Sequence, residues 1–287
     1  MKEHASTDIY LGRNPIARSL ASVEGSFVRL HDELFYRIRS YDRMPPFLMS
    51  IVSSSDTWMF LSSSGGITAG RRHSDAALFP YYSVDRISEN SGNTGPATIV
   101  RVNTGSQTYL WEPFSSRCAG AYMTTRHLYK NALGTNVIFE EVNDDLGLIF
   151  RYSWTSSERF GFVRTAWIEN HSESGALVQI LDGVQNILPY GVTTATQARM
   201  SNLLDAYKRA ELEARTGVAI YSMSSTLTDL AEPSESLLAT RVFCCGLPQP
   251  VVLLSNTQMG RFRLSGQVEH EHDVRGHRGA YFVVDSF

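Results

Sequence analysis

The sequence predicts a mainly β protein built as a layered sandwich, and three observations support this prediction. Charged residues make up only 19% of the 287 residues and hydrophobic residues 43%, a balance that suits a β-rich protein better than a helical bundle. The segment from Trp154 to Gly191 reads as a long strand, a polar turn at 170–175 and a second long strand. Only one segment, after Tyr190, places apolar residues at helical spacing.

The first strand of the segment from Trp154 to Gly191 is apolar on both of its faces. The residues concerned are Phe160 and Phe162 on one face, and Val163 and Trp167 on the other. A strand that is apolar on both faces needs a covering layer on each side. We therefore expect this strand to lie in the middle of a large β domain with two packed sheets.

The N-terminal half is expected to consist of a polar arm over residues 1–24 followed by strands. Over residues 28–39 apolar and polar side chains alternate, with a break at 31–33, which predicts a strand, a turn and a strand. Further strands are expected at 47–53, 57–63, 98–103 and 107–112. The stretch 65–87 contains turn residues and reads as a long loop.

One helix interrupts the strands of the C-terminal half. Thr194 to Gln197 have the form of a capping box with Thr194 as the N-cap, and Gly217 marks a C-terminal stop. Between them, apolar residues recur at helical spacing, namely Met200, Leu203, Leu204, Tyr207 and Ala210. This pattern predicts one long amphipathic helix of about five turns, packed on a sheet. The strands expected in this half are 137–142, 146–154, 218–225, 237–245, 250–255, 260–270 and 279–287.

Composition and charge exclude several classes of function. The net charge is −3 and like charges form no runs, so a nucleic-acid partner bound through a basic surface is not expected. No stretch has the ~18 consecutive apolar residues of a membrane span, and the N-terminus lacks a signal-peptide core; we expect a cytoplasmic protein with no membrane partner. Cys118, Cys244 and Cys245 are interpreted as small buried hydrophobic residues in strands. Residues 25–287 are expected to form a single domain, because no linker divides them.

Short sequence motifs between residues 28 and 245 carry a resemblance to a known family. The motifs are Tyr36-Arg37-Ile38, Tyr41-Asp42, Pro46-Phe47, Trp111-Glu112-Pro113-Phe114 and Trp167-Ile168-Glu169-Asn170-His171-Ser172. Together with the helix expected after Ile187–Gly191, they resemble the N-terminal domain of cellobiose-phosphorylase-like proteins. None of these motifs is catalytic in that family.

The resemblance implies a two-sheet β-supersandwich of the galactose-mutarotase-like type. In such phosphorylases an (α/α)6 barrel follows the sandwich and supplies the general acid and the site for inorganic phosphate. The sandwich itself builds a homodimer and closes part of the active-site cleft. This chain ends at Phe287, before a barrel of that kind begins. We therefore expect a non-catalytic carbohydrate-binding and assembly domain of a glycoside phosphorylase- or hydrolase-like enzyme that acts on β-glucans or related oligosaccharides.

The loop 65–75 is the main candidate for binding an oligosaccharide. Its glycines allow close backbone approach, and its two arginines offer paired donors to hydroxyls or phosphate. The residues expected to bind are Arg71, Arg72, His73 and Asp75, with Tyr81, Tyr82 and Trp111 as faces for a sugar ring. The alternative is a structured surface loop in which the arginines pair with Asp75 and Asp85.

Two acidic segments invite other interpretations. Residues 269–273, with His277 beyond, have the composition of a metal cluster, but their spacing matches no zinc template and alternate residues of a strand face opposite ways. We interpret them as a charged strand edge and expect neither a metal ion nor a cofactor. The carboxylate pairs Glu140-Glu141 and Asp144-Asp145 are interpreted as solvated turn residues.

A stand-alone sugar mutarotase or epimerase is the main alternative function, and a simple carbohydrate-binding module is another. Mutarotation requires a base and an acid on one sheet face. His127 and Glu269 are candidates for these roles, although nothing in the sequence brings them together. His171 is a weaker candidate because it falls in an expected turn.

Overall fold

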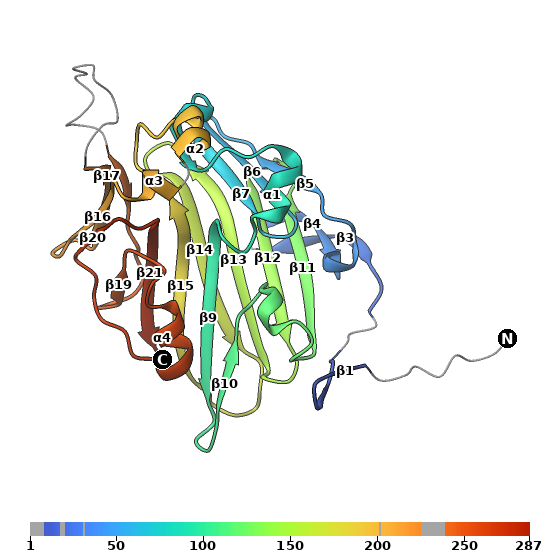
Figure 1. Ribbon diagram of the computed structural model, residues 1–287. Helices are drawn as coiled ribbons and strands as arrows, with labels where there is room; N and C mark the ends of the chain where they lie inside the picture. The colour runs from blue at the N-terminus through green and yellow to red at the C-terminus, as the bar shows by residue number, and fades with distance from the viewer. Residues whose placement is uncertain (1–8, 18–20, 31, 201, 225–238) are drawn as a thin grey trace, which may run out of the picture.

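The computed structural model describes residues 9–17, 21–30, 32–200, 202–224 and 239–287, and their fold is mainly β, as predicted. Two large antiparallel sheets face each other (Figure 1). The six-stranded sheet has the order β14-β13-β12-β11-β4-β3. Its strands are β3 (Glu24–Leu30), β4 (Glu33–Arg39), β11 (Thr124–Asn131), β12 (Asn136–Asn143), β13 (Leu148–Ser157) and β14 (Gly161–Asn170).

The second sheet has five strands, in the order β10-β9-β15-β21-β19. These strands are β9 (Gly95–Asn103), β10 (Thr108–Trp111), β15 (Leu177–Ile187), β19 (Val251–Leu253) and β21 (Gly279–Ser286). Strand alternation directs Val100 toward the six-stranded sheet and Ile99 away from it, and both are fully buried. The main core between the sheets contains Phe139, Phe150 and Trp111, each at most 1% exposed.

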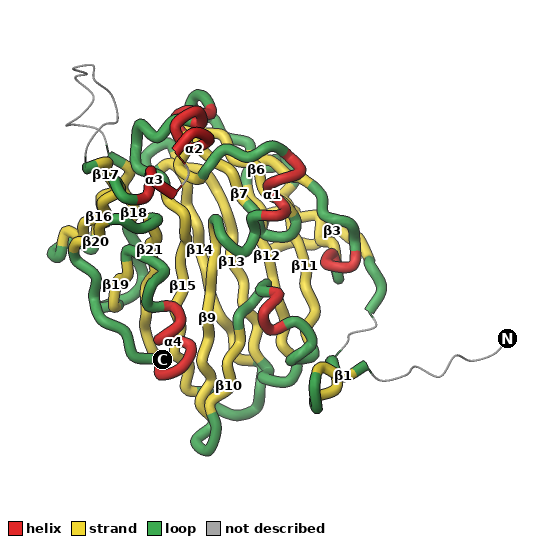
Figure 2. Tube along the Cα trace, viewed as in Figure 1, coloured by secondary structure: helices red, strands yellow, loops and turns green. Residues whose placement is uncertain are grey.

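Helix α4 (Met259–Ser265) covers the outer face of the five-stranded sheet. Its Met259 and Phe262 pack against Leu181 and Phe282, which point away from the main core. Figure 2 shows α1, α2 and α3 toward the top of the view, whereas α4 lies over the strands. The sequence predicted a strand over 260–270, which is wrong: the apolar residues Phe262 and Leu264 do not share a buried sheet face, since Leu264 is 87% exposed.

The segment from Trp154 to Gly191 does contain long strands, but it is not one hairpin. The turn at Phe160 divides the expected first strand into the end of β13 and all of β14. Strand β14 is the edge of the six-stranded sheet, whereas β15 lies in the centre of the other sheet. The chain therefore crosses between layers at 170–177. Strand β14 is apolar on both faces because Phe162 packs in the main core and Trp167 packs on the outer face; it is half-buried at an edge rather than central.

Two four-stranded sheets extend the sandwich. One has the order β5-β6-β7-β8 and contains β5 (Leu48–Ile51), β6 (Thr57–Ser62), β7 (Ile67–Arg71) and β8 (Ala77–Phe79). The other has the order β18-β17-β16-β20 and contains β16 (Lys208–Glu213), β17 (Val218–Met223), β18 (Thr240–Val242) and β20 (Asp273–Arg275). The stretch 65–87 is thus not a long loop, because it forms β7, β8 and helix α1 (Val84–Glu89). Single 3-10 turns occur at Tyr41–Arg43, Ser74–Ala76 and Ser116–Cys118.

The long amphipathic helix predicted after Gly191 is wrong. The structure has two short helices, α2 (Thr194–Met200) and α3 (Asn202–Asp205), and then strand β16. The pairing of β16 with β17 decides the conformation, because it places Ala210 opposite Tyr221 and buries both in the main core. Gly217 adopts a positive φ of 69° in the turn between these strands and does not end a helix.

Two expected segments fall partly outside the described residues. The N-terminal arm is described only at 9–17 and 21–24, where β1 (Tyr10–Leu11) pairs with β2 (Asn14–Pro15). Residues 237 and 238 of the strand expected at 237–245 lie outside the described part. In the described residues, no helix has both the length and the apolar character needed to cross a membrane.

Candidate functional site

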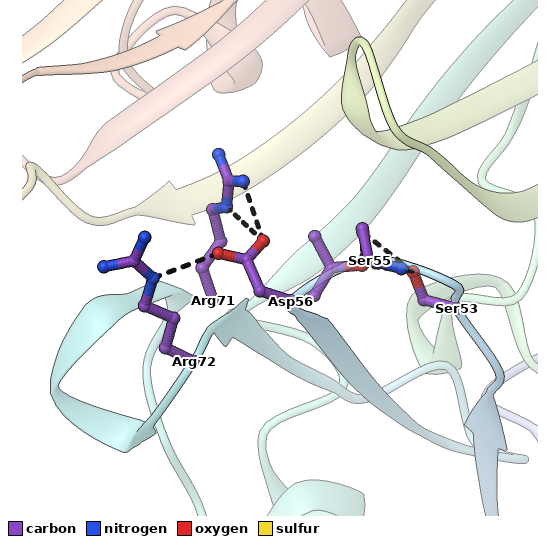
Figure 3. A network of polar contacts seen from close by, with 6 residues as sticks. Ser53, Ser55, Asp56, Arg71 and Arg72 are labelled. Atoms are coloured by element: carbon purple, nitrogen blue, oxygen red, sulfur yellow. Dashed lines mark hydrogen bonds and ion pairs between the residues drawn. The ribbon is translucent and has the colours of Figure 1, made fainter.

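The two arginines of the predicted binding loop lie at the end of β7, and both bind Asp56 (Figure 3). Arg71 donates from Nε and Nη2 to Oδ1 of Asp56 at 2.9 and 2.7 Å, and Arg72 donates from Nε to Oδ2 at 3.2 Å. These hydrogen bonds, with that of Arg71 the strongest influence, hold the pKa of Asp56 below its usual value. The arginines therefore pair with Asp56, and not with Asp75 or Asp85 as the alternative interpretation supposed.

The other predicted sugar-binding residues do not gather around these arginines. The carboxylate of Asp75 accepts a hydrogen bond from the backbone N–H of Thr194 at 2.8 Å. His73 is exposed, Tyr82 is half-buried, and the exposed ring of Tyr81 meets the edge of Trp58 at 6.0 Å.

Trp111 was expected to offer a face to sugar, and this is wrong. It is 0% exposed, lies between the two large sheets, and donates from Nε1 to Glu141 at 2.8 Å.

A row of ionisable side chains crosses the outer face of the six-stranded sheet. Cross-strand register places Glu24 opposite Arg39, Arg39 opposite His127, His127 opposite Glu140, and Glu140 opposite Arg151. We call these five residues the polar row. The apolar residues of the same face come from the strands of the sheet itself: Val28, Leu30, Phe35, Tyr129, Ile138 and Trp167. Of the polar row, only His127 was predicted as a site residue.

Glu140 is the most buried carboxylate of this face, at 3% exposed. It accepts a hydrogen bond from the Tyr129 hydroxyl at 2.8 Å and a charge-assisted one from Arg151 Nε. Arg151 also binds Glu169, which in turn contacts His171 at 3.0 Å. Burial raises the pKa of Tyr129, and the charge of Glu140 raises it further. The interpretation of Glu140 as a solvated turn residue is therefore wrong.

Glu141 is likewise buried, at 2%, but it faces the opposite way, into the core. It accepts hydrogen bonds from Trp111, from the backbone N–H of Phe114 at 2.7 Å and from Arg126 Nε at 2.7 Å. Sequence neighbours on a strand thus reach two different polar clusters. Asp144 and Asp145, by contrast, are exposed in the β12–β13 turn as predicted.

His127 is buried beside the carboxylate of Glu140. Its Nδ1 accepts the backbone N–H of Ser40 at 3.3 Å, and its Nε2 lies 3.9 Å from Oε1 of Glu140. A ring nitrogen that accepts a hydrogen bond carries no proton, so the neutral ring holds its proton on Nε2. Burial lowers the pKa of His127 despite the nearby carboxylate.

The second mutarotase candidate, Glu269, does not join His127. It forms an ion pair with Arg261 of α4 at 2.8 Å, on the exposed surface.

The acidic segment 269–273 closes a loop around Glu271. This carboxylate accepts the backbone N–H groups of Leu254 and Ser255 at 2.7 and 2.8 Å, and Nδ1 of His270 accepts the N–H of Val252. Residues 269–272 are not a strand, so the strand-edge interpretation fails there. Over the described residues, no group of His, Cys, Asp or Glu is arranged to hold a metal ion.

The cysteines are not buried in strands as interpreted. Cys244 and Cys245 are exposed, and Cys118 is partly exposed at the end of a 3-10 turn.

Sequence reasoning missed a recess in the described part of the chain. It has a volume of about 410 Å³ and lies between the inner face of β3, β4 and β11 and the strand β5. We call it the aromatic groove. The lining residues that define its character are Phe27, Tyr36, Phe47, Met49, Lys130 and Leu133. The only signal in the sequence was that aromatic residues of neighbouring strands fall in register, with Phe27 opposite Tyr36.

A scan of protein-family models finds no match to this chain, and a search of curated proteins finds none either.

Proposed function

We propose that this chain is a non-catalytic domain that binds carbohydrate and assembles a larger glycoside phosphorylase- or hydrolase-like enzyme acting on β-glucans or related oligosaccharides. The carbohydrate context rests on the sequence resemblance stated above. In this proposal the two large sheets form a supersandwich of the galactose-mutarotase-like type, and the domain contributes to a homodimer. Reaction would require catalytic groups from outside these residues.

The observation that most supports a binding role is the state of the ionisable groups on the outer face of the six-stranded sheet. The Glu140 carboxylate accepts hydrogen bonds from Tyr129 and Arg151, and one ring nitrogen of His127 accepts the Ser40 N–H. A general base needs a free lone pair that faces its substrate. Groups that are satisfied by one another instead hold strands in register and give a preformed surface.

Binding without turnover tests this function. The purified chain should bind short oligosaccharides in calorimetry. In the same buffer with inorganic phosphate, it should release no reducing sugar and consume no phosphate. Sugar-dependent phosphate consumption by residues 1–287 alone would contradict the proposal, as would the absence of any heat with neutral and acidic glycans.

A mutarotase is a second candidate, favoured by the 3.9 Å approach of His127 Nε2 to Glu140 Oε1 on one sheet face. If these groups exchange protons with a sugar, polarimetry will show faster anomer interconversion than in buffer. Glu140→Gln should then abolish the acceleration, and Asp144→Asn, an exposed turn control, should preserve it. Rates equal to buffer for several hexoses would remove this candidate.

A further inference from the structure

The aromatic groove is an open recess with the volume of a small-ligand site. Its volume of about 410 Å³ lies within the ~300–1,000 Å³ of typical ligand pockets. Phe27 is 67% exposed and Tyr36 is 43% exposed, although both are large and apolar. Their rings meet edge to face at 5.1 Å. Exposed ring faces in a recess are suited to the apolar C–H faces of a flat ligand such as a sugar ring.

Gly25 sets the position of the Tyr36 ring. A Cβ atom on Gly25 would lie 2.0 Å from the Tyr36 hydroxyl oxygen. The absence of a side chain at this position therefore leaves room for the hydroxyl end of the Tyr36 ring over β3. The Tyr36 ring forms one wall of the aromatic groove, and the glycine at position 25 is what allows the ring to lie there.

The groove contains one unpaired cation. Of the two lysines in the described residues, Lys208 binds Asp205 at 2.6 Å, whereas Lys130 has no ion-pair partner there. Lys130 stands opposite Tyr36 on β11, so its ammonium group and the exposed rings share one face. An ammonium group beside apolar walls attracts an anionic group strongly, because nearby carboxylates do not neutralise it.

We propose that the aromatic groove binds an acidic sugar, a hexuronic acid unit of an oligosaccharide, whose ring lies on Phe27 and Tyr36 and whose carboxylate pairs with Lys130. This inference rests on the proposed carbohydrate-binding function and narrows the ligand to acidic oligosaccharides, since β-glucans themselves carry no carboxylate. A neutral sugar would leave the ammonium group without a counter-charge. A second copy of the chain docking at the β3 edge is the competing occupant, and it would need a carboxylate of its own to meet Lys130.

Calorimetry with two matched probes tests the ligand class. A galacturonic acid trimer should bind more tightly than a glucose trimer, and added salt should weaken only the acidic trimer. Lys130→Gln should lower the affinity for the acidic trimer about tenfold or more, and Lys130→Arg should restore most of it. Tyr36→Ala and Gly25→Ala should weaken binding through the ring, whereas Phe160→Ala, an exposed aromatic residue outside the groove, should have no effect.

A measurement on the unsubstituted chain covers the case in which a variant fails to fold. The chain has three lysines, and reductive ¹³C-methylation labels each while preserving its charge. The acidic trimer should shift the Lys130 methyl signal and leave the Lys208 signal in place. Equal binding of both trimers, or an unmoved Lys130 signal, would overturn the acidic-sugar inference and leave the proposed function intact. No binding of either trimer would contradict the proposed function itself. Concentration-dependent dimerisation that Phe27→Ala abolishes would assign the groove to a second copy and overturn the inference.

Discussion

His127 shows how one buried side chain links the structure to pH. The residue is 9% exposed, and its ring accepts a backbone N–H from Ser40. Burial penalises the protonated ring, and so the pKa of His127 lies below the ordinary value of 6.5. Protonation of Nδ1 would also remove the acceptor of the Ser40 N–H. The unfolded chain faces neither penalty. As pH falls below 6.5, the unfolded state therefore binds this proton first.

The free energy of unfolding should consequently fall on acidification below pH 6.5, and His127→Gln should flatten that fall. One proton bound only by the unfolded state changes the free energy by up to about 1.4 kcal/mol per pH unit. Above pH 6.5 both states leave the ring neutral, so this group adds no further pH dependence. Urea unfolding of both proteins at several pH values between 5 and 8 measures the difference. Parallel pH profiles would show that His127 does not titrate differently on unfolding.

Glu140 should be worth far more to stability than the acidic residues of the neighbouring turn. Replacing it with Ala leaves the Tyr129 hydroxyl without its acceptor and Arg151 with only Glu169. We expect a loss of about 1–3 kcal/mol, which is the cost of leaving buried polar groups unsatisfied. Asp144→Ala, in the exposed turn, should stay within about 0.5 kcal/mol of the parent chain. Similar midpoints for the two variants in urea unfolding would refute the buried role.

At the scale of elements, the N-cap of α2 lies one residue earlier than the sequence predicted. The capping-box pattern predicted Thr194 as the N-cap. In the structure the hydroxyl of Thr193 accepts the N–H of Thr196 at 3.1 Å, and its backbone oxygen accepts the N–H of Gln197 at 3.0 Å. The Thr194 N–H instead binds Asp75. Thr193 therefore caps the helix.

Thr193→Ala should destabilise the protein by about 1 kcal/mol, the usual cost of removing an N-cap side chain. Thr194→Ala should cost much less, because its interaction with Asp75 uses the backbone N–H, which alanine keeps. Thermal unfolding of the two variants under one set of conditions ranks them. The reverse order would restore Thr194 as the cap.

Local sequence patterns predicted several strands correctly but did not predict how those strands pair in the sheets. The alternation at 28–39 gave β3 and β4, and the Asn143–Asp145 turn correctly separated β12 from β13. Ala210, however, suited both a helix stripe and a buried strand, and only its pairing with Tyr221 decides between them. The hydrophobic pattern of one segment does not show which other segment it will pair with.

The candidate sites were harder to predict for the same reason. Arg71 was correctly placed on the surface, but its partner Asp56 lies on the preceding turn and not in the predicted loop. Trp111 looked like a binding residue because aromatic side chains serve both cores and sugar sites. The aromatic groove forms only when β3, β4, β11 and β5 come together, and predicting this requires knowledge of the sheet order.

On the scale of the whole molecule, a buried ion pair connects the two large sheets. Arg164 of β14 donates to both oxygens of Asp182 on β15, at 2.6 and 2.9 Å, and Thr98 adds a hydrogen bond to the same carboxylate at 2.6 Å. The guanidinium also lies over the Tyr152 ring at 4.9 Å. This cluster spans the layer between the sheets, which apolar side chains fill apart from the buried cluster around Glu141.

Asp182→Ala should lower the free energy of unfolding by about 3–5 kcal/mol, because it leaves the buried guanidinium of Arg164 without a counter-charge. Replacing both partners, as Arg164→Met with Asp182→Leu, should recover much of that loss, since two apolar residues leave no unpaired charge. Glu173→Gln, in the exposed 170–175 turn, is the control for a simple change of charge. Urea unfolding measures all three. A double variant no more stable than Asp182→Ala would mean that the pair itself, and not the orphaned charge, dominates.

The polar row also limits which alternative sheets the chain can form while it folds. A slip of β12 by one residue would turn Glu140 into the core, among the aromatic rings around Phe139. A slip of two residues against β13 would keep Glu140 on the same face but place it opposite Ile149 or Ser153, and Arg151 would lose Glu140 as a partner. The ion pairs Glu24–Arg39 and Glu140–Arg151 both form only when the strands that carry them are in the native alignment. The polar row thus destabilises misaligned strand pairs, because their ionisable side chains lack partners. We expect this selection to act before the two sheets pack together.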